Sequence, residues 1–299
     1  MVAVVIIYAG NILIGKAIND LPPFTIAMIR FMIAFAILFP IGFHAAWKNR
    51  ATFLEHKVPF LIMTLSGVAF FNMFIYGALQ YTSASNVAVL ETVIPVTTIL
   101  LSAFFLKERL IRIQWIGILL SFIGAIWVVL DGQFFQLTSM AWNIGDVIMI
   151  GAIISWAVYS IYVKQYMHLF PPYAAIFLMT GISMIVLFPF VVVEWVVMGI
   201  PTFDVSNHLP GLLYFGIFPS LVALVFYNRA VDLLGPSQAS IFLNFLPVFT
   251  MIGAYLWLNE TVTVVQVVGA FVVMGGVLLT TQVKKKEEKV DIPVVKEHA

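Results

Sequence analysis

The chain has 299 residues, of which 62% are hydrophobic and only 10% are charged, and its formal net charge is +1. Soluble domains carry about 25% charged residues, so this composition excludes an ordinary soluble protein and indicates a membrane protein. The sequence contains no cysteine, which excludes disulfides and thiolate metal sites.

Ten apolar segments follow one another along the chain, each close to the ~20 residues that a membrane-spanning helix needs. No alternating strand pattern with turn signals recurs, and lipid demands a backbone whose hydrogen bonds are satisfied internally. We therefore predict an all-α polytopic membrane protein of ten transmembrane helices. The predicted spans are 2–18, 22–43, 58–80, 84–106, 111–130, 142–164, 172–198, 209–231, 236–258 and 262–282.

Lysine and arginine are distributed unevenly between the loops. If the N-terminus is cytoplasmic, the outer loops contain neither residue, and only Lys16 and Arg30 lie inside apolar segments. The positive-inside rule then predicts an inner or plasma membrane protein with both termini in the cytoplasm. Residues 284–299 form a basic cytoplasmic tail, which we expect to contact anionic membrane lipid.

The two halves of the chain repeat one another. Residues 81–117 align with 233–269 without a gap, and the matches include polar and helix-breaking residues that apolar composition alone does not explain. Five spans in each half make the second repeat (134–283) inverted relative to the first (1–133), with a central cavity between them, as in many secondary transporters. The matched pairs are Ser85/Ser237, Pro95/Pro247, Thr98/Thr250, Glu108/Glu260, Gln114/Gln266, Gly117/Gly269 and Gly124/Gly276.

A longer motif surrounds these matches and is joined by the segment 22–30, PPFTIAMIR. Its residues in the first half are Ala78, Tyr81, Ser83, Ala84, Ser85, Pro95, Leu106, Lys107, Glu108, Arg109, Gln114, Gly117 and Gly124. This pattern resembles the EamA family of the drug/metabolite transporter superfamily over residues 5–282. The resemblance implies a basket in which helices 1–4 and 6–9 surround a cavity and helices 5 and 10 are peripheral. Glu91 departs from the family pattern, which has an apolar or small residue there.

Arg30 and Glu91 are ionisable residues inside predicted spans, where charges are costly and usually face water or a partner. At about 1.5 Å per residue, both lie roughly 10–12 Å below the outer surface, so an ion pair between them is geometrically allowed. In a functional role, the pair would be opened by a substrate or by a coupling proton. In a structural role, it would clamp helix 2 to helix 4. Arg30 could instead extend its side chain to the headgroups, and Lys16 is best explained as an interfacial lysine of that kind.

Uncharged polar and aromatic side chains gather on five predicted helices. Each alone is explained by a hydrogen bond between helices, but together they predict a polar and aromatic pocket. The stripe of Asn72 and Tyr76 should face Trp156 and Tyr159 across it. The predicted substrate-binding residues are Asn11, Asn72, Tyr76, Glu91, Thr92, Trp156, Tyr159 and Asn244. The predicted coupling or gating residues are Arg30, Glu91, Pro95 and Pro247, the prolines acting either as hinges or as fixed kinks.

These features predict a secondary transporter that moves a small metabolite, an amino acid or a related organic compound, by alternating access, with export as the expected direction. The alternative is an intramembrane enzyme or a channel-like scaffold. No phosphate-binding loop, GxSxG or HExxH motif occurs, and the histidines are scattered. We therefore expect no enzymatic activity, no cofactor, no metal site and no nucleic-acid partner.

Overall fold

All regular structure in the described part of the chain is helical, as the composition predicts. The structure is a computed structural model that describes residues 1–106, 110–130, 132, 143–234 and 242–282. Seven helices or runs of consecutive helices there are long and apolar enough to cross a membrane, and three shorter apolar helices accompany them. The predicted turn around Glu108 and the basic tail 284–299 lie outside the described residues.

Within the described residues, each predicted span contains one helix or a run of helices that follow closely on one another along the chain. The first repeat forms α1 (Val2–Ala17), α2 (Pro23–Lys48), α3 (Arg50–Glu55), α4 (Lys57–Met63), η1 (Thr64–Phe70), α5 (Phe71–Leu79), α6 (Ala84–Glu91), α7 (Ile94–Leu106) and α8 (Arg112–Val129). The second repeat forms α9 (Ile144–Tyr166), η2 (Met167–Leu169), α10 (Pro172–Met198), α11 (Val205–Ile217), η3 (Phe218–Ala223), α12 (Leu224–Leu234), α14 (Leu246–Trp257) and α15 (Val264–Gln282).

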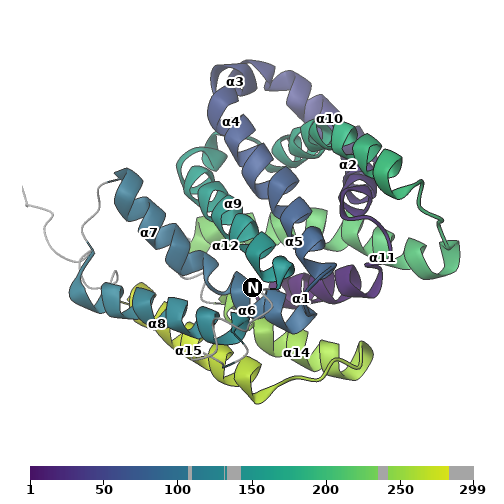
Figure 1. Cartoon of the computed structure of the whole chain (residues 1–299). Coiled ribbons are helices and arrows are strands. Elements are labelled where there is room, and N and C mark those ends of the chain that lie inside the picture. The colour runs from purple at the N-terminus through teal and green to yellow at the C-terminus, as the bar shows by residue number, and fades with distance from the viewer. Residues whose placement is uncertain (107–109, 131, 133–142, 235–241, 283–299) are drawn as a thin grey trace, which may run out of the picture.

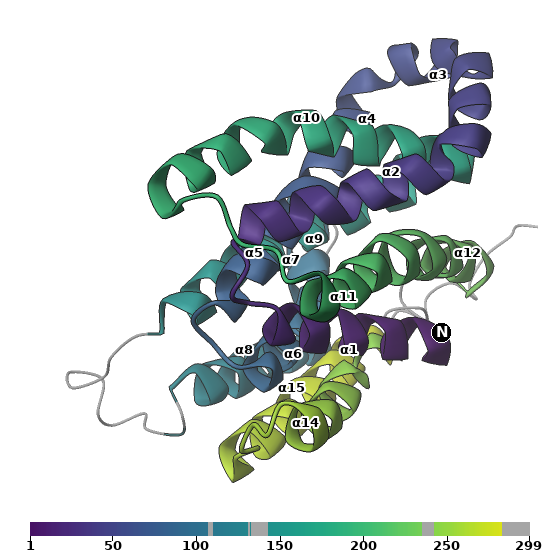
Figure 2. The ribbon, with the colours of Figure 1, turned by 90° about the vertical axis from the view of Figure 1, so that its right-hand side faces the viewer.

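Helices of the two repeats pack in equivalent pairs. α2 packs against α10, and α8 packs against α15 at one edge of the molecule (Figures 1 and 2). α1 of the first repeat packs against α14 of the second, and at the equivalent place α9 of the second packs against α7 of the first. In each case the first helix of one repeat packs against a helix of the other repeat, as expected for an inverted repeat.

The α8/α15 pair is held by close backbone contact. A Cβ atom on Gly117 would lie 2.6 Å from the carbonyl oxygen of Gly276, and a Cβ on Gly276 would lie 2.6 Å from that of Gly117. Any larger residue at either position would force the helices apart. The hydroxyl of Ser121 adds a hydrogen bond of 3.2 Å to the carbonyl of Val273. Small residues thus make a tight seam at the edge of the bundle.

The start of α2 is capped by a carboxylate from another helix. Pro22 precedes the helix and has no side-chain acceptor, so the first amide groups need an external partner. Glu194 of α10 accepts from the amides of Phe24 and Thr25 at 3.0 and 2.8 Å and from the Thr25 hydroxyl at 2.7 Å. Glu194 is accordingly only 6% exposed, although it carries a carboxylate.

The repeated prolines interrupt two helices at equivalent positions. Helical structure breaks at Thr92 and Val93, between α6 and α7, and again at residues 244–245, immediately before α14. Pro95 and Pro247 have no amide hydrogen, so neither can bond to the carbonyl four residues earlier. Each proline is the second residue of the helix that follows the local break.

Two π-helical segments also occupy nearly equivalent places. η1 interrupts the run between α4 and α5, and η3 interrupts the run between α11 and α12, starting 154 residues later. π-helical turns are uncommon and occur frequently at functional sites. With the proline breaks, they place four backbone irregularities in equivalent helices of the two repeats.

Candidate functional site

Arg30 is the centre of a buried hydrogen-bond network that joins the two repeats. It lies on α2, is only 6% exposed, and its Nε donates to the Ser220 hydroxyl of η3 at 2.6 Å. Its Nη1 donates to Asn11 at 3.2 Å, to the Tyr76 hydroxyl at 2.7 Å and to the Asn72 side-chain oxygen. All of these acceptors are neutral, so the guanidinium is held in place without being neutralised.

Arg30 faces a narrow cavity of ≈ 70 Å³ between the repeats. One water molecule needs ~10–15 Å³ of such space, so the cavity has room for only a few waters. It is far smaller than the ~300–1,000 Å³ of typical ligand pockets. Of the described residues that line it, none belongs to α8 or α15. The structure is therefore a conformation closed around its centre, with the edge helices outside the cavity wall, as the resemblance implied.

Glu91, the last residue of α6, lines the same cavity. Its half-buried carboxylate makes no hydrogen bond or ion pair with any residue that the structure describes. The ion pair with Arg30 that the sequence allowed is therefore not formed. Neutral oxygens hold Nε and Nη1 of Arg30, and Nη2 has no partner among the described residues. One cavity thus contains a guanidinium and a carboxyl group that do not bind each other.

Aromatic rings form the wall contributed by α9. The Trp156 ring lies 4.4 Å from that of Phe71 and 5.0 Å from that of Tyr159, measured between centroids, and meets Tyr8 edge-on at 6.5 Å. Within the described part of the chain, the buried hydroxyls of Tyr8 and Tyr159 have no hydrogen-bond partner. Buried polar groups are normally paired, so these two hydroxyls are available to water or to a ligand in the cavity.

The other predicted site residues lie near the cavity but do not line it. Tyr76 is behind Arg30, where it also donates to Asn11 at 3.0 Å. The Thr92 hydroxyl is turned to its own helix and donates to the carbonyl of Val89 at 2.6 Å. Asn244 is buried without a partner among the described residues. Pro95 and Pro247 each directly follow a residue of the cavity wall.

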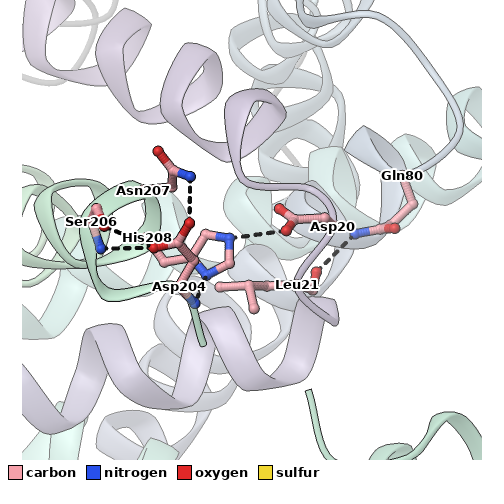
Figure 3. Close-up of polar contacts among 7 residues, drawn as sticks. All are labelled: Asp20, Leu21, Gln80, Asp204, Ser206, Asn207 and His208. Atoms are coloured by element: carbon pink, nitrogen blue, oxygen red, sulfur yellow. Dashed lines mark hydrogen bonds and ion pairs between the residues drawn. The ribbon is translucent and has the colours of Figure 1, made fainter. Parts of the chain in front are cut away.

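The end of the bundle that contains Asp20 is closed by contacts between the repeats. His208 of α11 lies 2.9 Å from Asp20 of the first repeat (Figure 3). Asp204, one residue before α11, accepts from Ser206 and Asn207 (Figure 3). The hydrogen bond from the Ser206 hydroxyl, with that from the Ser206 amide, holds the pKa of the Asp204 carboxyl below its usual value.

Further contacts at this Asp20 end cap the helices of the first repeat. Glu260 accepts from the amide of Ala84 at 3.1 Å, at the start of α6. Lys16 donates to the carbonyls of Leu79 and Thr82, both at 2.9 Å, so it binds protein rather than lipid headgroups. The Thr82 hydroxyl donates to Asp146 of α9 at 2.7 Å. Opening a path from this end to the cavity would require several of these bonds to break.

Comparison with known proteins identifies the family. The profile of the EamA-like transporter family matches residues 1–130 and 143–282. The chain belongs to the EamA-like transporter family. This transporter is 25% identical over 264 residues to the uncharacterized transporter YyaM of Bacillus subtilis (strain 168), covering 87% of this chain and 85% of YyaM.

Two further comparisons agree with this assignment. An uncharacterized transporter of Archaeoglobus fulgidus is 27% identical over 281 residues, which are 92% of this chain and 94% of that protein. A solved crystal structure superimposes with a TM-score of 0.59 at 17% identity, covering 95% of this chain and 97% of that one, and shows the same fold. The protein is therefore a membrane transporter of the EamA-like family.

The cavity of this EamA-like transporter is lined by equivalent positions of the two repeats. Tyr8 corresponds to Trp156 and Asn11 to Tyr159, 148 residues apart. Val68 corresponds to Ser220 and Ile94 to Leu246, 152 residues apart. The members of each pair all line the cavity. Near-equivalent positions of an inverted repeat thus meet around one centre.

Sequence reasoning missed Tyr8 and Ser220. Tyr8 could have been found, because the alignment of 8–16 with 156–164 pairs it with Trp156, which had been predicted. Ser220 had no such signal. Its hydroxyl reaches Arg30 from the π-helical segment η3 while donating to the carbonyl of Phe215 at 2.7 Å. Periodicity of 3.6 residues does not anticipate a π-helical turn.

Proposed function

We propose that this protein is a secondary active transporter that exports a small zwitterionic metabolite, an amino acid or a related compound, by alternating access. The observation that carries the proposal is the unpaired arrangement of Arg30 and Glu91 in one cavity. A guanidinium and a carboxylate that do not bind each other are suited to a ligand that carries both opposite charges. The cavity between inverted repeats is also where transporters of this architecture bind substrate.

The substrate would bind through its two charged groups. Its carboxylate would accept from the Nη2 edge of Arg30, because a guanidinium matches a carboxylate with parallel hydrogen bonds. Its ammonium would lie at Glu91, beside the Trp156 ring, since an aromatic face also attracts a cation. The unpaired hydroxyls of Tyr8 and Tyr159 would complete the polar contacts. The apolar part would then lie against α10 and α14, where Met179 and Leu246 line the cavity.

A proton would be exchanged for the substrate at Glu91. The carboxylate can bind an ammonium or carry a proton, but not both at once. Burial disfavours a lone charge, so a proton would replace the departing ammonium. Proton entry would in this way be coupled to substrate exit. The proposal of export depends on this competition.

Alternating access would use the irregular segments of the cavity helices. The space of ≈ 70 Å³ must expand before a metabolite can enter. The breaks before Pro95 and Pro247, with η1 and η3, interrupt the regular hydrogen-bond ladder at the depth of the cavity, where bending breaks the fewest bonds. Opening toward the Asp20 end would separate Asp20 from His208 and Glu260 from Ala84.

In the cell membrane, the Asp20 end would face outward. The opposite end, which contains Arg50, would face the cytoplasm. The cations Lys48, Arg50, Lys57, Lys164 and Arg229 lie toward the Arg50 end, and the positive-inside rule assigns that end to the cytoplasm. Cysteines introduced by Asn207→Cys and Glu288→Cys should then react with an impermeant thiol reagent from opposite sides. Labelling of both from one side would contradict the orientation.

Counterflow in proteoliposomes tests the function. Vesicles loaded with an unlabelled amino acid should take up the labelled one transiently above equilibrium, and an inward proton gradient should drive release. A thermal-shift screen against amino acids, polyamines, quaternary amines and purines would select the compounds to load. A channel-like scaffold would equilibrate the label without counterflow, and an intramembrane enzyme would change it chemically. Either result would reject the proposal.

A further inference from the structure

A strip of aromatic side chains runs along the outside of α2 toward the Arg50 end. Phe35, Phe39, Phe43 and Trp47 recur every four residues and share one face of the helix. Successive ring centroids are 6.1, 5.4 and 6.3 Å apart. The guanidinium carbon of Arg50 lies 5.0 Å from the centroid of Trp47 and continues the strip. The strip of rings therefore ends at the positively charged guanidinium of Arg50.

The strip forms one wall of an apolar groove of ≈ 630 Å³. α10 forms the facing wall, where the Phe177 ring stacks on Phe35 at 4.6 Å and a Cβ on Gly181 would lie 2.8 Å from the Phe35 ring. α3 closes the groove beside Arg50 with Phe53 and Leu54. Phe39 and Phe43 are each 49% exposed and Trp47 is 63% exposed, so the groove is open on its lipid side.

The dimensions of the groove match one leaflet of a bilayer. From Phe35 to Trp47 the helix rises ~18 Å at 1.5 Å per residue. Half of the hydrocarbon core is about 15 Å thick. An acyl chain lying along the strip would therefore reach the bilayer interior at Phe35 while its headgroup was level with Arg50.

The charge at the Arg50 end selects the headgroup. Lys48, Arg50 and Lys57 are exposed there, with Glu55 as the acid among them. None of the three cations forms an ion pair with a residue that the structure describes. Basic pockets between membrane helices at this level bind anionic lipid headgroups. Arg50 is suited to a phosphate, because its guanidinium presents parallel donors.

Comparison with the second repeat indicates that the fold does not require this strip. The prolines that start α2 and α10 are 149 residues apart, and at that spacing the four rings correspond to Met184, Phe188, Val192 and Val196. Arg50 corresponds to Gly199. The equivalent helix therefore packs in the same bundle with one ring in place of four and with no cation.

We propose that this groove binds one anionic phospholipid, with an acyl chain along Phe35, Phe39 and Phe43 and its phosphate at Arg50. Binding at this site is separate from the central cavity and involves neither Arg30 nor Glu91. It does not depend on which metabolite is transported.

Native mass spectrometry of the purified full-length protein tests the proposal. The protein is titrated with phosphatidylglycerol and, separately, with phosphatidylcholine that has the same acyl chains. We expect one phosphatidylglycerol to bind preferentially. Arg50→Gln should weaken its binding about fivefold, the effect of one cation near the membrane surface, and should leave phosphatidylcholine binding unchanged.

Two matched variants control this result. Arg112→Gln removes an exposed arginine at the start of α8, outside the groove, and should not change the preference. Phe39→Ala should weaken both lipids about fivefold through lost apolar contact, whereas Phe188→Ala, at the equivalent position of α10, should not. Equal binding of the two lipids to the wild-type protein, or equal losses with Arg50→Gln and Arg112→Gln, would overturn the proposal.

Discussion

The two repeats contribute the same positions to the central cavity but different chemistry. Arg30 and Glu91 of the first repeat line the cavity, and the equivalent positions of the second repeat are Met179 and Leu243, which line it too. The guanidinium and the carboxyl group of the cavity wall therefore both come from the first repeat, and apolar side chains occupy the equivalent positions of the second. An inverted repeat determines where side chains meet, while each half can change the groups that it presents there.

The backbone has remained more alike than the side chains. The π-helical segments η1 and η3 and the helix breaks before Pro95 and Pro247 occur in equivalent helices. A movement that opens one end and closes the other needs similar deformability in both halves. Recognition of an asymmetric substrate needs the halves to differ. The variants below test this division by making the first repeat more like the second, or by removing one member of an equivalent pair.

Arg30→Met, which copies the residue of the second repeat, should have the largest effect. It removes the donor that Asn72, Tyr76 and Ser220 share, and a buried acceptor left unpaired costs about 1–3 kcal/mol. It also removes the proposed carboxylate contact, so substrate binding should fall roughly 10- to 100-fold. Thermal melting and substrate-induced thermal shifts measure the two losses.

The matched control for Arg30→Met is Met179→Leu. This change keeps volume and polarity, so it should cost less than about 1.5 kcal/mol and leave binding unchanged. Normal substrate affinity in the folded fraction of Arg30→Met would show that the arginine is only structural.

Glu91→Gln should remove transport while preserving the fold. The carboxylate has no partner among the described residues, so its replacement leaves none of their buried donors without an acceptor. Counterflow should fall roughly 10- to 100-fold, as expected for a lost hydrogen bond to a charged group, and the flux that remains should no longer respond to pH.

Leu243→Met, at the equivalent position of the second repeat, is the control and should keep both flux and its pH response. The melting temperature of Glu91→Gln distinguishes a coupling role of Glu91 from a structural one. If Glu91→Gln lowered the melting temperature strongly while the folded protein transported normally, the carboxylate would be a structural group and the coupling proposal would fail.

Tyr159→Ala should weaken substrate binding more than Trp127→Ala. Tyr159 lines the cavity from α9, whereas Trp127 belongs to α8, which contributes nothing to the described cavity wall. Losing one aromatic contact should reduce affinity about tenfold. Tyr159→Phe keeps the ring and removes only the unpaired hydroxyl, so it should have an intermediate effect. Equal losses with Tyr159→Ala and Trp127→Ala would place the binding site elsewhere.

The smallest effect should come from Asp204, which caps α11 in the second repeat. His56, at the corresponding helix start in the first repeat, makes no side-chain cap. The lowered pKa of Asp204 means that the ionised cap stabilises the fold above the usual carboxyl pKa, and that this contribution is lost as pH falls through the lowered value. The melting temperature of Asp204→Ala should therefore lie slightly below wild type at neutral pH, and the gap should close in strong acid. A gap that persisted in acid would contradict this role.

The sequence by itself determined the class of fold and the family. Apolar segments of spanning length leave helices as the only regular structure that lipid tolerates, and polar matches at one fixed spacing reveal a duplication. Asn11, Arg30, Asn72, Glu91, Trp156 and Tyr159 line the cavity, and each was identified from the cost of leaving a polar group in hydrocarbon. That cost depends only on residue type and depth, which a sequence contains.

Only the tertiary structure decided which groups bind one another. Depth allowed an ion pair between Arg30 and Glu91, but the rotation of α2 and the π-helical turn at Ser220 direct the guanidinium to neutral oxygens. Thr92 and Asn244 have suitable chemistry at suitable depth, yet neither lines the cavity, because the helix breaks beside them change which side chains face it. Helical period predicts a face only while the helix is regular, and here the regularity is lost at the site itself.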